Sequence, residues 1–358
     1  MRETPGAVGG LPPAPGRGDA PDPLLFALTM GEPAGIGGEI ALDAWRRRSP
    51  TSPRFVMIDD PERLARLAER LGWAVPIRTV GAPEEAVGVF ESALPVLAQP
   101  LAVAVEPGRP DPANAPVVAG AIERAVRLAE QGAVAGLVTN PIHKAVMQQG
   151  GFAFPGHTEY LAALTGTPAG REVMLLACAE LRVVPVTIHV ALRDAIAGLT
   201  TQAIVTAGQV AADALRRDFG LTAPRIAVAG LNPHAGEDGA MGREDIEIVA
   251  PAVAALRARG IDAFGPLPSD TMFHAAARAG YDLALCMYHD QALIPLKTLG
   301  FDRGVNVTLG LPVVRTSPDH GTAFALAGSG RADPGSLLAA LDTAAAIAAA
   351  RAAFDRTH

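Results

Sequence analysis

Three histidines follow short apolar segments, at the positions where the strands of a parallel sheet would end. They are His189 in VVPVTIHVALRD, His234 in IAVAGLNPHAGEDG and His289 in LALCMYHDQALIPLK. Separations of 45 and 55 residues exclude a local zinc-finger loop but suit ligands from different strand ends. A single histidine so placed is usually a structural hydrogen-bond partner. Three at equivalent positions predict an open, catalytic site for Zn²⁺ or a similar divalent ion.

A second group of side chains suits an anion. The segment TNPIHK begins a predicted helix that carries Lys144, and FPGHTEYLA begins another at His157 and Thr158. Helix N-termini carry partial positive charge, so two of them beside a lysine favour phosphate or carboxylate binding. The alternative is that Thr158 only caps its helix and Lys144 lies on a solvated face.

A third segment, KTLGFDRGVNVTLGLPVVRTSPDHG, carries Lys297, Asn306 and Arg315 around a short apolar strand. Lysine acts as a point charge and arginine as a planar fork, and both hold phosphate or carboxylate groups. Taken one at a time, these residues could equally be surface cations beside a turn.

The glycine-rich segment LLFALTMGEPAGIGGEI is a weaker signal. Gly31, Gly35 and Gly37 follow a predicted strand and precede a predicted helix, but their spacing is neither a Walker loop nor G-x-G-x-x-G. Such a turn either exposes backbone N–H groups to a phosphate or is merely a tight connection.

The elements that position these residues alternate between strand and helix, which predicts an α/β fold with a mostly parallel sheet. Helical spacing or composition predicts helices over 241–260 and 334–356. The predicted strands are 24–29, 54–58, 134–139, 173–177, 183–188, 226–231, 283–287 and 305–309.

Composition excludes several classes of function. The 358 residues carry a net charge of −7, so no overall electrostatic attraction favours nucleic acid or acidic lipid. No apolar run reaches the ~18 residues that a membrane span needs. Cys178 and Cys286 lie in apolar segments, which favours buried free thiols and a cytoplasmic protein. Residues 1–22, rich in Pro and Gly, are predicted to be a disordered extension.

Taken together, these segments resemble the 4-hydroxythreonine-4-phosphate dehydrogenase family of vitamin B6 synthesis, from about residue 24 to the last helix. The motifs that carry the resemblance are TMGEPAGIGGEI, TNPIHK, FPGHTEYLA, LRVVPVTIHVALRD, GLNPHAGEDGAMGRE, GPLPSDT, MYHDQALIPLK, GFDRGVNVTLGLP and RTSPDHGTAFALAG. Glu32 stands where an aspartate is more common in the family.

The resemblance implies a three-layer α/β/α fold like that of isocitrate and isopropylmalate dehydrogenases, with two lobes and a cleft between them. The expected first lobe is 23–138 with 311–358, and the second is 139–310, carrying most metal and dimer contacts. A homodimer with shared active sites is expected.

The resemblance also implies the roles of individual residues. Metal ligands would be His189, His234 and His289, one of them from the partner chain, and they would hold one divalent ion per site (Zn, Mg, Co or Mn). The expected substrate contacts are His157, Thr158, Lys297, Asn306 and Arg315.

The implied reaction is oxidation of the C3 hydroxyl of 4-phosphohydroxy-L-threonine to a β-keto acid, which decarboxylates to 3-amino-2-oxopropyl phosphate. NAD, or NADP, would accept the hydride, and the residues that bind it stay unassigned. Lys297, Asp270 and Asp290 are candidates for the base. The alternatives are a sister dehydrogenase of 4-phosphothreonate or 4-phosphoerythronate, and a non-catalytic metal- and phosphate-binding protein.

Overall fold

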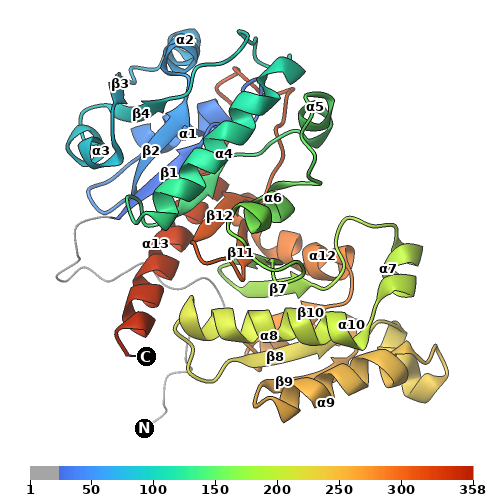
Figure 1. Ribbon diagram of the computed structural model, residues 1–358. Helices are drawn as coiled ribbons and strands as arrows, with labels where there is room; N and C mark the ends of the chain where they lie inside the picture. The colour runs from blue at the N-terminus through green and yellow to red at the C-terminus, as the bar shows by residue number, and fades with distance from the viewer. Residues whose placement is uncertain (1–23, 358) are drawn as a thin grey trace. The chain divides into compact units, whose positions relative to one another are not determined.

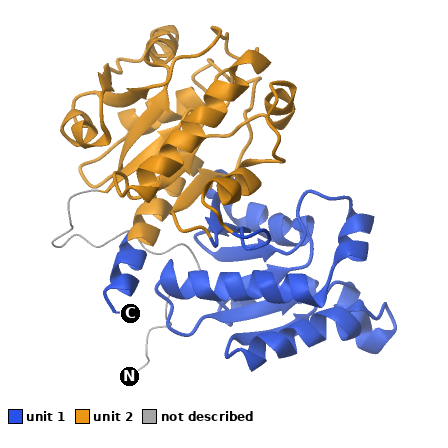
Figure 2. Cartoon of the chain, viewed as in Figure 1, with its two compact units in different colours: residues 1–12, 168–310, 349–358 blue, residues 13–167, 311–348 orange. Residues whose placement is uncertain are grey.

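The computed structural model describes residues 24–357, which form two compact units (Figures 1 and 2). Unit 1 comprises Pro168–Gly310 and the described residues from Ala349 onward. Unit 2 comprises the described residues up to Thr167, together with Leu311–Ala348. The predicted extension, residues 1–22, lies outside the described part of the chain. Both units are mixed α/β, which confirms the predicted fold class.

Unit 2 is built on parallel strands that are buried on both faces. Leu25 and Ala27 of β1 pack in one apolar core with Ile122 of α4, while Phe26 and Leu28 are buried on the opposite face. Side chains alternate along a strand, so burial of both sets requires a covering layer on each face. This burial produces the predicted three-layer arrangement. The strand order is β3 (Ile77–Val80), β4 (Leu94–Ala98), β2 (Arg54–Asp59), β1 (Leu25–Thr29), β5 (Leu137–Thr139) and β12 (Arg315–Pro318).

The helices of unit 2 connect these strands, and most begin at a recognisable cap or proline. Asp60, for example, accepts hydrogen bonds from the backbone of Glu62 and Arg63 at the start of α2, where Pro61 occupies the first helical position. The helices are α1 (Gly37–Arg46), α2 (Pro61–Leu71), α3 (Pro83–Val89), the 3₁₀ turn η1 (Pro112–Asn114), α4 (Ala115–Glu130), α5 (Lys144–Gln149), α6 (His157–Leu164) and most of α13 (Gly335–Asp355).

Unit 1 has a mixed sheet. Strand β6 pairs antiparallel with both β11 and β7, whereas β7, β10, β8 and β9 run parallel to one another. The strand order is β11 (Val305–Leu309), β6 (Val173–Cys178), β7 (Leu181–Pro185), β10 (Leu283–Cys286), β8 (Arg225–Ala229) and β9 (Asp262–Leu267). Cys178 and Cys286 are buried free thiols in its core, as predicted.

In unit 1, α12 packs against β6, β7 and β10. Its apolar residues Ala292, Leu293 and Leu296 enter the core that contains both cysteines. The helical elements are α7 (Leu192–Gly198), α8 (Thr201–Arg217), η2 (Pro233–Gly239), the π-helical turn η3 (Asp245–Val249), α9 (Ala250–Ala258), α10 (Ser269–Met272), α11 (Ala275–Arg278), α12 (His289–Gly300) and η4 (Phe301–Arg303).

The division into units differs from the predicted lobes at two places. Residues 139–167 belong with β1, because Met147, Tyr160 and Leu161 pack in the same core as Leu25. At the other end, residues from Ala349 onward belong to unit 1, where Arg351 Nε lies 2.8 Å from the buried carboxylate of Asp218.

The C-terminal helix α13 matches the helix predicted over 334–356. By length and composition alone it could cross a membrane. Leu337, Leu341 and Ile347, however, are buried in the fold. We therefore assign α13 as a partly buried core helix.

Candidate functional site

His189 and His289 lie together in unit 1. His189 follows β7, and His289 is the first residue of α12, just after β10; these two strands are parallel neighbours. The ring centroids of the two imidazoles are 5.7 Å apart. Two imidazoles on one tetrahedral ion, each nitrogen ~2.0–2.1 Å from the metal, have ring centres roughly 5 Å apart. The pair therefore fits two ligands of a common divalent ion.

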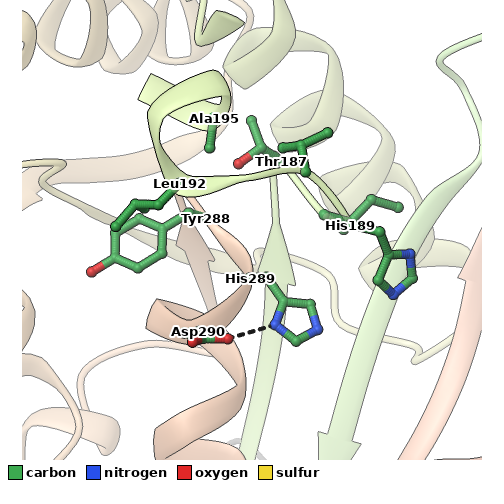
Figure 3. Close-up of a pocket in the computed structure, with 9 residues that line it drawn as sticks. Thr187, His189, Leu192, Ala195, Tyr288, His289 and Asp290 are labelled. Carbon is green, nitrogen blue, oxygen red and sulfur yellow. Dashed lines mark hydrogen bonds and ion pairs between the residues drawn. The ribbon is translucent and has the colours of Figure 1, made fainter. Parts of the chain in front are cut away.

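Asp290 holds the ring of His289. Its Oδ1 lies 2.7 Å from His289 Nδ1, and Figure 3 shows Asp290 on one side of that ring and His189 on the other. A carboxylate on Nδ1 fixes the tautomer that leaves Nε2 as the electron-pair donor, as in carboxylate–histidine–metal arrangements. This contact favours an orienting role for Asp290.

Two adjoining hollows surround His289. The first is lined by His189, Leu192 and Tyr288 together with His289 and Asp290 (Figure 3). The second shares His289 and Asp290 and extends along α12 to Lys297. The structure thus brings together four of the predicted site residues: His189, His289, Asp290 and Lys297.

His234 lies elsewhere in unit 1, exposed on the loop that follows β8. Among residues 24–357, no group of three or more His, Cys, Asp or Glu side chains could hold a metal ion. Within one chain, therefore, the described residues supply two of the three predicted imidazoles at one place.

The backbone that carries His234 has an unusual conformation. From His234 to Asp238 five consecutive residues have φ between 43° and 82°, and Gly236 is the only glycine among them. A left-handed conformation costs a non-glycine residue ~1–2 kcal/mol. Strain of this kind collects at functional sites, where the surrounding structure must hold it in place.

Gln291 links the loops that carry these histidines. Its amide nitrogen donates to the Gly230 carbonyl and to Ser269 Oγ, both at 2.7 Å, and its Oε1 accepts from the backbone N–H of Met287 at 2.6 Å. One buried side chain thus ties the end of β8 and the start of α10 to the start of α12. Sequence reasoning missed Gln291, although it lies two residues after His289 in the motif MYHDQ.

Unit 2 holds a separate group of cations. Arg315 is buried at the start of β12, and its Nη2 donates to Thr139 Oγ1 at 2.7 Å, at the end of β5. Burial lowers the pKa of Arg315 to about 10. This value is still well above neutral pH, so the guanidinium remains charged there. Nε2 of His157 is buried and has no hydrogen-bond partner among the described residues. Such an atom near a buried guanidinium marks a place that a polar ligand can complete.

Lys144 and α6 lie beside this group. A Cβ placed on Gly156 would lie 3.9 Å from Lys144 Nζ, so the ammonium group lies against the residue that precedes α6. Gly156 is the N-cap of α6, and no side chain caps this helix end. Thr158 is therefore not the cap, whereas Lys144 is exposed, as the solvated-face alternative predicts.

His157 makes stability depend on pH. Its pKa lies well below the usual 6.5, first because of burial and then because of the charges on Arg315 and Lys144. Unfolding restores the ordinary pKa, so below about pH 6.5 the unfolded chain binds a proton that the folded chain does not, and stability falls with falling pH. We expect His157→Gln to reduce the pH dependence of the free energy of unfolding in this range by up to about 1.4 kcal/mol per pH unit. Urea unfolding of both proteins between pH 7.5 and 5.5 measures the difference; parallel curves would contradict it.

The glycine-rich turn packs closely against the end of β5. A Cβ on Gly31, whose φ is +65°, would lie 2.6 Å from the Pro141 carbonyl oxygen. Asn140 Nδ2 donates to the carbonyl of Thr29 at 3.0 Å, and Glu32 is buried, with Oε1 accepting from the Ala34 N–H. These contacts close the turn against β5.

Asn306 and Asp270 complete the predicted set. Asn306 lies on β11, and its Oδ1 is buried without a hydrogen-bond partner in the described chain. Asp270 is exposed on α10 and lines neither of the two hollows beside His289.

Comparison with known proteins identifies the family. Residues 51–344 match the family described as "Pyridoxal phosphate biosynthetic protein PdxA". The 4-hydroxythreonine-4-phosphate dehydrogenase of Methylorubrum populi is 58% identical over 338 residues, which cover 92% of this chain and 96% of that protein. The protein of the same name from Caulobacter vibrioides is 56% identical over 330 residues, covering 91% and 98%.

A solved structure agrees with this match. The crystal structure of 4-hydroxythreonine-4-phosphate dehydrogenase from Klebsiella pneumoniae superimposes with a TM-score of 0.82 at 40% sequence identity, covering 91% of this chain and 98% of that one. With a family match over most of its length and relatives at these identities, the chain belongs to the PdxA family of pyridoxal phosphate biosynthetic proteins and is an oxidoreductase.

Proposed function

We propose that this protein is an NAD-dependent, metal-dependent 4-hydroxythreonine-4-phosphate dehydrogenase. The observation that carries the proposal is the match, over almost the whole chain, to relatives of that name. The reaction oxidises the C3 hydroxyl of 4-phosphohydroxy-L-threonine, and the β-keto acid then loses CO₂ to give 3-amino-2-oxopropyl phosphate. A dehydrogenase implies a nicotinamide cofactor, and NAD would supply the hydride acceptor.

His189 and His289 of one protomer, with His234 of a second copy, would hold the divalent ion. Two observations support this assignment: the distance between the His189 and His289 rings, and the hydrogen bond between His289 Nδ1 and Asp290. When bound, the ion would polarise the C3 oxygen of the substrate and lower the pKa of its hydroxyl. Imidazole donors suit Zn²⁺ and Co²⁺ better than Mg²⁺ or Mn²⁺.

A homodimer would complete the site. Nine large apolar side chains are more than a third exposed among the described residues, and eight of them lie in unit 1. They include Leu192 on α7 (56% exposed), Ile294 on α12 (64%) and Phe301 on η4 (73%). Exposed apolar surface of this kind favours a protein–protein contact, here with a second copy.

Lys297 is the base that the geometry favours. It lines the same hollow as His289, whereas Asp290 is bonded to the His289 ring and Asp270 lines neither hollow. In its neutral form, Lys297 Nζ would take the proton of the C3 hydroxyl while hydride leaves C3 for the nicotinamide. Asn306 Oδ1, buried without a partner, would accept a hydrogen bond from the substrate.

Arg315, His157 and Thr158 would bind the phosphate, with Lys144 beside them. The charged guanidinium and the uncapped N-terminus of α6 both favour an anion, and His157 Nε2 would gain the partner it lacks. The role of these side chains would be to bind the substrate and not to transfer its proton.

The substrate can be tested directly by NADH formation. We expect turnover of 4-phosphohydroxy-L-threonine to exceed that of 4-phosphothreonate and 4-phosphoerythronate, which carry no ammonium group beside the carboxylate. EDTA should abolish the signal, and Zn²⁺, Co²⁺, Mg²⁺ or Mn²⁺ added singly should restore it to different extents. Faster turnover of either sugar acid would assign the protein to the sister activity. Phosphate and metal binding without any NADH would indicate the non-catalytic alternative.

As a metabolic enzyme with two buried free thiols, it would work in the reducing cytoplasm.

A further inference from the structure

The left-handed run from His234 to Asp238 needs an anchor. Four of its five residues carry a side chain that disfavours this conformation, and both His234 and its neighbours Glu237 and Asp238 are exposed. Exposed residues receive little packing support from the core. The conformation must therefore be held by contacts at the base of the loop.

Asp245 provides these contacts. Its carboxylate is buried, with the residue 1% exposed. Oδ1 accepts from the backbone N–H of Leu231 at 2.6 Å, and Oδ2 accepts from both the backbone N–H and the side-chain amide of Asn232 at 3.0 Å. One carboxylate thus fixes the two residues from which the chain turns toward His234.

Two glycines make room for this carboxylate. A Cβ on Gly230 would lie 3.0 Å from Asp245 Oδ1, and a Cβ on Gly236 would lie 3.2 Å from Oδ2. The carboxylate therefore contacts both the start and the middle of the loop. A larger residue at either glycine would displace it.

We infer that Asp245 is a positioning residue for His234: its carboxylate holds the left-handed turn in the one conformation that presents the imidazole to the metal. This role rests on the proposed function, in which His234 is a metal ligand. Because the turn is already formed, five residues need not lose conformational entropy when the ion binds. Contacts that hold a metal ligand in its binding orientation typically raise metal affinity by roughly 10- to 100-fold.

The test is Co²⁺ binding to the metal-free, full-length protein, followed by the visible absorption of the ion. Asp245→Asn keeps the size of the side chain but can no longer accept all three hydrogen bonds. We expect its Co²⁺ affinity to fall by roughly 10- to 100-fold. Glu244→Gln is the matched control, because Glu244 Oε2 accepts from the same Asn232 amide at 2.9 Å, whereas the backbone N–H groups of Leu231 and Asn232 donate to Asp245. Its affinity should stay within about twofold of the unchanged protein.

Thermal unfolding followed by circular dichroism measures the stability of each variant. Comparison with its Co²⁺ affinity distinguishes a positioning role of Asp245 from a general effect on stability. If Asp245→Asn lowers the melting temperature but binds Co²⁺ as tightly as the unchanged protein, the inference is wrong. Should that variant fail to fold, Asn232→Ala removes the side-chain hydrogen bonds to both Asp245 and Glu244 and leaves the two backbone hydrogen bonds to Asp245. Compared with Glu244→Gln, it is expected to weaken Co²⁺ binding several-fold. Unchanged affinity in Asn232→Ala would then overturn the inference.

A His234→Ala arm distinguishes this inference from the proposed function. If His234→Ala binds Co²⁺ like the unchanged protein, His234 is not a ligand and the metal assignment fails. If His234→Ala loses binding and Asp245→Asn does not, the metal assignment stands and only the positioning role of Asp245 is rejected.

Discussion

Replacement of His234 by alanine is expected to lower kcat by several orders of magnitude and to remove the dependence of the residual rate on added metal. If His234 is the third ligand, its loss would weaken binding of the ion, which would otherwise make the C3 hydroxyl more acidic. KM for the phosphorylated substrate should change less, because the proposed phosphate contacts, Arg315 and His157, are unaltered in this variant. Steady-state NADH formation with and without EDTA gives both quantities. Near-normal turnover of the variant in the presence of EDTA would contradict the metal assignment.

Mixed dimers test whether His234 acts in the site of the other chain. In a heterodimer of His189→Ala and His234→Ala subunits, one site keeps an intact His189–His289 pair and receives an intact His234 from the other chain. Random exchange should therefore restore about a quarter of the original activity. A mixture of His189→Ala and His289→Ala subunits should stay inactive. Every chain in that mixture lacks either His189 or His289, so no site has both of these ligands. Restoration in the second mixture would show that the pairing of ligands proposed here is wrong.

Replacement of Arg315 by alanine is expected to raise KM by roughly a hundredfold and to lower kcat much less, since charge-assisted bonds to phosphate are present in both the ground and the transition state. Arg315→Lys should recover only part of the loss, because an ammonium group cannot reproduce the planar fork. Initial rates over a range of substrate concentrations measure the two effects. A fall in kcat at unchanged KM would place Arg315 in the chemical step instead.

Arg124→Ala is the control for loss of a partly buried arginine in the same unit. Its Nη1 donates to the carbonyl of Ala98, the last residue of β4, at 2.9 Å. This variant should show a KM close to that of the unchanged protein. An equal rise in KM in both variants would mean that the effect comes from disturbed packing of unit 2.

The apolar strands were predictable because burial on both faces leaves a continuous hydrophobic run. All eight predicted segments overlap strands of the structure, whereas β3, β4, β9 and β12 were missed. Strand β3 is a short edge strand with exposed Arg78 and Thr79, β4 and β9 contain proline, and β12 reads RTSP. In 241–260 the chain forms a π-helical turn before α9, and Pro251 is tolerated because it lies in the first turn of α9.

The site was predictable where a residue type alone indicates its chemistry. Imidazoles after strands pointed to His189 and His289, which the structure places together. Gln291 and Asp245 act through ordinary hydrogen bonds to backbone groups that are distant in sequence, so no local pattern indicates them. The position of His234 could not be deduced from spacing, because it depends on a backbone conformation that non-glycine residues rarely adopt.

The left-handed loop also limits how this segment can evolve. Valine, isoleucine and threonine crowd the backbone most severely at positive φ, so positions 234–238 are closed to β-branched residues. Insertion or deletion of one residue would change the direction in which the His234 imidazole points and, in the proposed dimer, would remove the third ligand. Sequence drift in this loop is thereby confined to a few small or polar residues, even though most of its side chains face water.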